Sequence, residues 1–295
     1  MPEGPEVRRY ADAVDAVLTG HTISSFDART REARKWLEAN GSRLMGRRVL
    51  SVRSHGKHLV GKIEGGFYFH SHLMMWGRWL TFVGHAPVEV DRRERARVAV
   101  EGGGAIMYSG PIFNVGKGDP CERIEHLETL GPDVLPYEGV FDEAEFRRRL
   151  QLPENRDSTI GVALLDQRIV AGLGNYLRAE VLFFCRLNPW AKVGQLNKRE
   201  MTCLSRTVPE LALRSYRFAA TASDGERERM QTDPSLVYQP GREMGTRHLV
   251  FRRTNLPCLH CSQPIRQLRQ TTSGTDEEDR SRIIYFCPQC QRVSL

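Results

Sequence analysis

The apolar residues of the chain follow strand-like spacing in its first half and helical spacing in most of its second half. Ahead of the strands, they recur every three or four positions from Pro5 to Leu18, which predicts an amphipathic helix ended by Gly20. Between Val49 and Val100, short runs rich in β-branched and aromatic residues alternate with turns that contain glycine or proline. This pattern predicts a sheet domain, a sandwich or a flattened barrel, with a helix at its N-terminus.

The helical segments follow residues 130–139, which contain two prolines and two glycines and predict a linker. Just beyond this linker, Asp142 and Glu145 have the spacing of a capping box at the start of a helix. Helical spacing then covers residues 158–172, 175–185 and 197–221. We expect residues 221–247, which are polar and rich in glycine and proline, to form a loop.

From Arg252 onward, strand-like runs return around four cysteines. The mixture of a sheet-rich part and a helix-rich part places the chain in the α+β class. We expect three domains: a sheet domain at 1–130, a helical domain with its loop at 131–247, and a cysteine-rich tail at 248–295.

The charge balance points to an acidic partner. The chain has 43 lysines and arginines against 36 acidic residues, which gives a net charge of +7 and a pI near 9.2. Such a balance favours a polyanion such as a nucleic acid. No apolar run reaches the roughly 20 residues of a membrane span, and the polar start lacks the apolar core of a signal peptide. We therefore expect a cytosolic protein that does not bind a membrane.

Two cysteine pairs with metal-binding spacing are the most specific signal in the sequence. They are Cys258 with Cys261 and, after 25 intervening residues, Cys287 with Cys290. Four thiolates can hold one tetrahedral zinc and leave it no open position, so we predict one structural Zn²⁺ per chain. An iron–sulfur cluster is the alternative, and His260 inside the first pair is a further ligand in principle. The other cysteines, which have apolar neighbours, are interpreted as buried thiols: Cys121, Cys185 and Cys203.

A turn with two glycines and an asparagine separates two of the predicted helices in VAGLGNYLRAEVLF. Gly172 and Gly174 can end the first helix, and Asn175 can cap the second. A second interpretation is that the bare turn lets a phosphate approach the amides of a helix N-terminus. The fragment alone favours capping.

Four motifs in this order resemble one family of DNA repair enzymes. They are MPEGPEVRR at the start, SHGKHLV around Lys57, LLDQRIVAGLGNYLRAEVL in the helical part, and the four cysteines of the tail. Together they resemble the formamidopyrimidine-DNA glycosylase and endonuclease VIII family. The resemblance implies a bifunctional DNA glycosylase and AP lyase that acts as a monomer on damaged DNA. It also implies a catalytic β-sandwich, a helix-two-turn-helix domain and a zinc finger as the three domains.

The resemblance assigns the chemistry to the first residues of the chain. Pro2, exposed by removal of the initiator methionine, would attack C1′ of the damaged nucleotide. An α-amino group suits this role, because it titrates at about pH 8 against about 10.4 for lysine, so that more of it is free base at neutral pH. Glu3 would act as general acid and base, and Glu6 would support this site. Lys57 would hold lesion phosphates and assist proton transfer.

Further DNA contacts are implied in the second half of the chain. Asn175 would bind the backbone phosphate beside the lesion. Arg282, five residues before the third cysteine, would bind phosphate and assist the second, δ, elimination. Arg280 is a possible substitute for it, and the acidic run at 276–279 would repel DNA unless it is turned away.

The branch of the family is indicated by two stretches of the sheet domain. In SHLMMWGRW, Met74, Met75 and Trp76 correspond to the residues with which endonuclease VIII fills the space of an everted base. A core-facing strand is the alternative interpretation. The formamidopyrimidine branch carries an Arg-Arg-Phe-Gly stretch where this chain has MYSGPIFNVG, so we expect oxidised pyrimidines as substrates. Oxidised purines, a noncatalytic damaged-DNA binder and an RNA-binding protein are the competing hypotheses.

Overall fold

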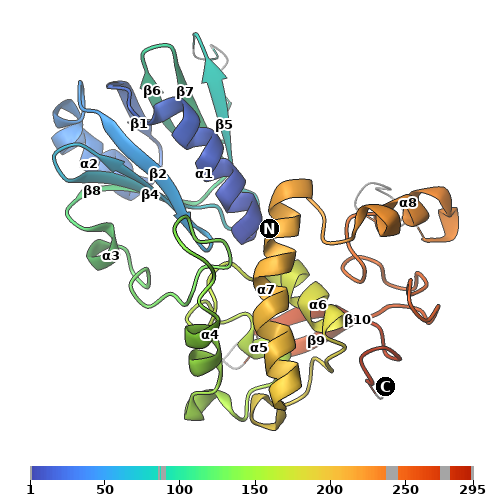
Figure 1. Cartoon of the computed structure of the whole chain (residues 1–295). Coiled ribbons are helices and arrows are strands. Elements are labelled where there is room, and N and C mark those ends of the chain that lie inside the picture. Colours follow the sequence, from blue (N-terminus) through green and yellow to red (C-terminus); the bar gives the residue numbers. More distant parts are fainter. Residues whose placement is uncertain (1, 86, 88–90, 237–244, 273–279, 294–295) are drawn as a thin grey trace. The chain divides into compact units, whose positions relative to one another are not determined.

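The computed structural model describes residues 2–85, 87, 91–236, 245–272 and 280–293. The chain divides into two compact units, Met1–Leu130 and Gly131–Leu295 (Figure 1).

The first unit contains two four-stranded antiparallel sheets and a long N-terminal helix, as expected for a sandwich. One sheet has the order β1 (Ile23–Ala28), β6 (Glu94–Val100), β7 (Gly103–Tyr108) and β5 (Arg78–Val83). The other has the order β2 (Val49–His55), β3 (His58–Ile63), β4 (Phe67–His72) and β8 (Ile112–Lys117). The helices are α1 (Gly4–Leu18), α2 (Arg31–Asn40) and the short α3 (Pro120–Arg123). The predicted N-terminal helix is thus confirmed, whereas α2, α3, β1, β7 and β8 were not expected.

An aromatic cluster fills the core of the first unit. The rings of Phe26, Phe69, Trp79 and Phe113 lie 6.0 to 6.2 Å apart in five neighbouring pairs. The Phe69 ring lies across Gly61 of β3, where an added Cβ atom would be only 2.1 Å from ring atoms. Glycine at this position therefore lets the aromatic core close onto the strand.

Helix α1 packs along β2 in the opposite direction. Its C-terminal end is tied to the start of β2, because the amide of Gly20 donates to the carbonyl of Val49 at 2.9 Å. One turn earlier in the helix, Asp15 accepts from the amide of Val52 at 2.7 Å and pairs with Arg53 at 2.9 Å. The N-terminus of α1 is therefore directed toward the far end of β2, where the turn with Lys57 begins.

The second unit combines helices with a C-terminal hairpin. Its helices are α4 (Glu143–Leu150), α5 (Ile160–Ala163), α6 (Asn175–Phe184), α7 (Lys198–Phe218) and α8 (Asp224–Thr232). The hairpin pairs β9 (Arg266–Thr272) with β10 (Arg280–Phe286). Helix α4 begins as predicted, because the side chain of Asp142 accepts from the amide of Glu145 at 2.9 Å.

Two predictions for this unit are wrong. Helical structure in residues 158–172 is limited to the four residues of α5. Beyond it the Gln167 side chain binds the carbonyls of Leu165 and Leu173 and the amide of Gly172, which stabilises a turn. The expected loop at 221–247 contains α8, whose N-cap Ser223 forms a capping box with Glu226; residues 237–244 lie outside the described part of the chain.

The three remaining cysteines are also not the buried thiols that the sequence suggested. Cys185 follows α6 and Cys203 lies in α7, and their sulfurs form a disulfide at 2.20 Å. They are 18 residues apart in the sequence, and the packing of α6 against α7 brings them together. Cys121 is exposed on α3.

Candidate active site and DNA-binding residues

The residues after Pro2 are held by a local hydrogen-bond arrangement. Pro2 is half-buried and directly precedes Glu3, the N-cap residue of α1, whose side chain is buried. Glu6 reaches back with one carboxylate oxygen to the amide of Glu3 at 2.9 Å. Its other oxygen accepts from the Arg9 guanidinium, also at 2.9 Å. The backbone that carries Pro2 is therefore fixed to the first turn of a rigid helix.

Lys57 lies on the tight turn between β2 and β3. The turn is closed by the cross-strand pair of His55 and His58 and contains Gly56 at φ +56°, in the left-handed region that glycine adopts without strain. Lys57 is buried, and only 9% of the residue is exposed. Its charge is thus held at the same end of β2 toward which the N-terminus of α1 points.

Three histidines on β3 and β4 surround this position. His58 Nδ1 lies 3.0 Å from His70 Nε2, and the ring of His72 lies edge-on to that of His58 at 4.9 Å. Burial lowers the pKa of His58 to about 3 and the pKa of His70 and of His72 to about 4. The charge of Lys57 contributes to the lowered pKa of His58 and His72. All three rings are therefore neutral at pH 7, which leaves Lys57 as the cation of this group.

The three residues expected to replace the everted base lie on the turn after β4. Met74, Met75 and Trp76 are 43%, 59% and 78% exposed, whereas the preceding Leu73 is buried in the core. The amide of Gly77 donates to the carbonyl of Leu73 at 2.8 Å and closes the turn. The three apolar side chains thus protrude from the unit, and the alternative of a core-facing strand is wrong for them.

In the second unit, Asn175 is the first residue of α6, and Gly174 takes the N-cap position that we had expected for Asn175. One turn further, the guanidinium of Arg178 is fully buried. It donates to the carbonyls of Gly161 and Ile283 at 2.9 Å. Its contacts with side-chain oxygens are longer, 3.2 Å to Gln270 and 3.4 Å to Asn175.

Arg178 thereby joins the start of α6 to the C-terminal hairpin. Its acceptor Ile283 follows directly on Arg282, which is exposed on β10. Arg282 pairs in register with the buried Gln270 of β9, whose amide donates to Thr159 and to the carbonyl of Pro189 at 3.0 Å. One hydrogen-bond network therefore holds Asn175 and the part of β10 that carries Arg282. The side chain of Arg280 and the acidic run at 276–279 lie outside the described residues.

The four cysteines of the tail form a cluster that fits a zinc ion. Their sulfurs all lie within 4.8 Å of one another. The distances between sulfurs are 3.9 Å for Cys258 and Cys290 and 3.4 Å for Cys261 and Cys287. Tetrahedral zinc with bonds of about 2.3 Å needs sulfurs about 3.8 Å apart. The four-cysteine set would hold structural Zn²⁺, and His260, whose exposed ring faces Glu226 at 3.8 Å, is not part of it.

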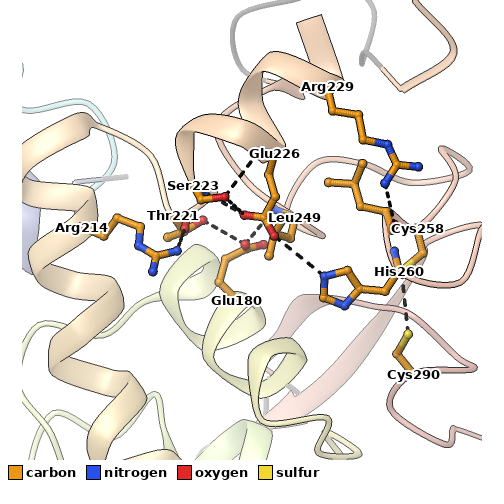
Figure 2. Close-up of polar contacts among 11 residues, drawn as sticks. Glu180, Arg214, Thr221, Ser223, Glu226, Arg229, Leu249, Cys258, His260 and Cys290 are labelled. Carbon is orange, nitrogen blue, oxygen red and sulfur yellow. Dashed lines mark hydrogen bonds and ion pairs between the residues drawn. The ribbon is translucent and has the colours of Figure 1, made fainter. Parts of the chain in front are cut away.

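Sequence reasoning did not single out Glu180, which holds a segment that precedes the first cysteine pair in the sequence (Figure 2). Its buried carboxylate accepts from the amides of Leu249, Val250 and Phe251 and from the Thr221 hydroxyl, at 2.8 to 2.9 Å. Burial raises the pKa of Glu180, and these donors oppose that shift. The acid two residues after Arg178 in an otherwise apolar helix was the available signal.

Helix α8 contacts the first cysteine pair directly. The Arg229 guanidinium donates to the carbonyl of Leu259 at 3.1 Å, and Glu226 faces His260 (Figure 2). Since Leu259 and His260 lie between Cys258 and Cys261, this helix supports the loop that presents the first two thiolates.

A sandwich led by a helix, a helical unit and a hairpin with four cysteines make up the described parts of the chain. The family model Formamidopyrimidine-DNA glycosylase N-terminal domain matches residues 1–111, and Formamidopyrimidine-DNA glycosylase H2TH domain matches residues 130–224. The chain belongs to the formamidopyrimidine-DNA glycosylase and endonuclease VIII family. It is therefore a bifunctional DNA glycosylase and AP lyase of base excision repair.

Curated relatives match over the whole chain. The formamidopyrimidine-DNA glycosylase of Dinoroseobacter shibae is 31% identical over 307 residues, covering 99% of this chain and 100% of the relative. Endonuclease 8 of Pectobacterium carotovorum is 29% identical over 293 residues, with 99% and 100% covered. The two similarities are close in size, so neither fixes the substrate.

Solved structures of Lactococcus lactis formamidopyrimidine-DNA glycosylase share the fold. A complex with DNA containing an abasic site superposes with a TM-score of 0.76 at 23% identity, covering 98% of this chain and 99% of that one. A complex with DNA containing an oxidised pyrimidine gives a TM-score of 0.74 at 23% identity, covering 99% and 100%.

Among the described residues, none of the helices combines the length and the apolar character that a membrane span needs.

Replacing Glu180 by glutamine tests the carboxylate that anchors residues 249–251. The amide group would turn an NH₂ toward backbone N–H donors, so we expect the free energy of unfolding to fall by about 1 to 3 kcal/mol. The measurement is thermal or urea unfolding of the zinc-loaded protein. Glu210→Gln, which removes only a surface ion pair with Arg214, is the matched control. Equal stability of the two variants would contradict the anchoring role.

Proposed function

We propose that the chain excises oxidised pyrimidines with the nitrogen of Pro2 as nucleophile and then cleaves the strand by β,δ-elimination. The observation that carries this proposal is the position of Pro2. It directly precedes a helix start braced by Glu6, and that helix points toward the end of β2 where the Lys57 turn lies. Once Met1 is removed, a reactive amine and the buried side chain of Lys57 are thus directed to one end of the same unit.

The proposed reaction begins when the secondary amine of Pro2 attacks C1′ of the damaged nucleotide. Its lone pair forms the C1′–N bond while the glycosidic bond breaks and the base leaves with a proton. The sugar ring then opens as the C1′–O4′ bond breaks, and Glu3 gives the ring oxygen a proton. The resulting cationic iminium accepts the electrons that two successive proton removals release, first expelling the 3′ phosphate and then the 5′ phosphate. Water finally hydrolyses the iminium, which releases the unsaturated sugar aldehyde and regenerates the amine of Pro2.

The other residues supply electrostatics and position. Lys57 would hold the phosphates of the lesion and assist proton transfer, and Asn175 would bind the phosphate beside it. Arg282 would bind phosphate and assist the δ-elimination. In this assignment residues 1–130 form the catalytic domain, 131–247 the helix-two-turn-helix domain and 248–295 the zinc finger, and one chain carries every group, so that the enzyme acts as a monomer.

The preference for pyrimidines rests on residues 107–116, which run from the end of β7 through the following turn into β8. The sequence there is MYSGPIFNVG, without the Arg-Arg-Phe-Gly stretch of the formamidopyrimidine branch. Its turn contains Ser109 at φ +56° and offers no arginine to the orphaned base. The apolar Met74, Met75 and Trp76 are in turn suited to fill the vacated space.

Replacing Pro2 by glycine should slow base excision by about tenfold or more, which corresponds to about 1.4 kcal/mol of lost transition-state stabilisation. Affinity for duplex containing a tetrahydrofuran abasic analogue should stay close to that of the wild type. Single-turnover excision and binding measure these two quantities, and borohydride trapping reports the covalent adduct. Pro87→Gly, at an exposed proline, is the control. Equal losses of excision and affinity would contradict the nucleophile role, and the absence of any trapped adduct in the wild type would favour a noncatalytic binder.

Replacing Asn175 or Arg282 by alanine should weaken binding to every lesion. Arg282→Ala should also reduce the slope of log K against log salt by about 0.9 for each phosphate contact that its positive charge makes. Binding is measured at four or more salt concentrations, with Gln289→Ala, a neutral change at an exposed position of the finger, as the control. An unchanged slope for Arg282→Ala would move the phosphate contact elsewhere, to Arg280 first.

A panel of defined lesions opposite each base tests the substrate class. We expect kcat/KM for dihydrouracil and thymine glycol to exceed that for 8-oxoguanine and formamidopyrimidine by about tenfold or more, equivalent to about 1.4 kcal/mol of differential transition-state binding. A duplex with thymine in place of the lesion is the undamaged control. A higher kcat/KM for the purine lesions would reverse the assignment to the endonuclease VIII branch.

A further inference from the structure

The turn that carries Met74, Met75 and Trp76, here called the wedge, has an unfavourable backbone conformation at its first residue. Met74 adopts φ +50°, in the left-handed region that residues with a side chain seldom occupy. Gly77 closes the turn so tightly that an added Cβ atom would lie 2.5 Å from the carbonyl oxygen of Leu73. Some interaction must therefore hold Met74 in this conformation while its side chain and its two neighbours remain exposed.

His72 supplies that interaction. The amide of Met74 donates to Nδ1 of His72 at 3.2 Å. A ring nitrogen accepts a hydrogen bond only when it carries no proton, so the His72 proton sits on Nε2. The low pKa of His72, caused by burial and by the positive charge of Lys57, keeps the ring neutral in physiological conditions.

A chain of neutral groups behind His72 fixes its ring. The ring of His58 lies edge-on to it at 4.9 Å and is itself stacked on His70 at 5.3 Å. The amide of Asn114 lies 3.3 Å from Nδ1 of His70, and Nε2 of His70 lies 3.0 Å from Nδ1 of His58. With Asn114 as donor, His70 and His58 both carry their proton on Nε2, which defines one tautomer for each ring.

We propose that His72 is a positioning residue for the wedge, and that its Nδ1 atom, through the amide of Met74, presets the turn that replaces an everted base in DNA. The hydrogen bond links strand β4 of the sheet, next to the Lys57 turn, to the side chains that enter the duplex. The inference rests on the proposed function of the wedge. It assigns to His72 a contact inside the protein through Nδ1, which leaves Nε2 available to other partners.

Two substitutions separate the two ring nitrogens. The side-chain oxygen of asparagine can occupy the place of Nδ1, whereas the terminal group of glutamine reaches the place of Nε2. His72→Asn should therefore preserve the hydrogen bond to Met74, and His72→Gln should lose it. His85→Gln, at an exposed histidine, is the matched control for the chemical change.

The readout is the fluorescence of 2-aminopurine placed opposite a tetrahydrofuran site, which responds when a side chain fills the vacated space. We expect His72→Gln to slow this change and the single-turnover excision of dihydrouracil from duplex about fivefold, the equivalent of one hydrogen bond of about 1 kcal/mol. His72→Asn should stay within about twofold of the wild type. Borohydride trapping on a single strand with a preformed abasic site, where no space needs filling, should be the same in all variants.

Two results would overturn the inference. Retention of activity in His72→Gln with loss in His72→Asn would mean that Nε2 does the work, for example on a phosphate. Equal behaviour of the two variants, whether both impaired or both unimpaired, would remove any role for Nδ1. The ¹⁵N shifts of His72 in the wild-type protein provide a test that needs no variant, since a protonated Nδ1 at pH 7 would also refute the proposal.

A separate variant distinguishes failure of this inference from failure of the proposed function. In Met74→Ala/Met75→Ala/Trp76→Ala, the wedge is removed while the Met74 amide and His72 remain. If this triple variant fills the space and excises dihydrouracil like the wild type, the wedge itself is misassigned. If it is impaired but the two His72 variants do not differ as expected, only the positioning role is wrong.

Discussion

The whole proposed mechanism depends on immobilising a chain terminus. The first residues of most domains are poorly ordered unless something ties them down, yet a nucleophile at residue 2 must be held within reach of one carbon atom. Here the tie is the carboxylate of Glu6, which binds the amide of Glu3 and is itself held by Arg9. The packing of α1 along β2 then gives the terminus a direction, through Asp15 and the backbone of Val52. The helix thus positions the nucleophile, as a strand or a loop does in enzymes whose nucleophile lies inside the chain.

In the second unit, two buried charged side chains on one helix hold other segments of the chain in position. Arg178 and Glu180 are two positions apart on α6, so their side chains leave the helix on opposite sides. Arg178 binds the hairpin through Ile283, and Glu180 binds the amides of residues 249–251. Buried charges are costly unless they are hydrogen-bonded, so these contacts favour the arrangement in which the partners of both side chains are in place. Asn175 and Arg282 inherit their relative placement from this arrangement.

The sequence was informative where the physical cause of a feature is local. The periodicity of residues 5–18, the spacing within each cysteine pair and the capping residue Asp142 each act within a few residues, and the structure has α1, the four-sulfur cluster and α4 where they were predicted. The contacts of Glu180 with residues about 70 positions away have no such local signature, and neither does the disulfide between α6 and α7. Helix α8 is different, because the capping box of Ser223 and Glu226 was visible but its polar composition outweighed it.

The chemistry of the wedge limits what it can recognise. Met74 and Met75 carry no hydrogen-bond donor and only weak sulfur acceptors, so they can fill space beside an orphaned base but cannot read its Watson–Crick edge. Trp76 adds a single donor, its indole N–H. Discrimination between opposite bases by hydrogen bonding is worth about 1 to 3 kcal/mol per bidentate pair, and this triplet cannot form such a pair. If the wedge acts as proposed, selectivity in this enzyme must therefore arise mainly from the pocket that receives the everted base and from the ease of unstacking it.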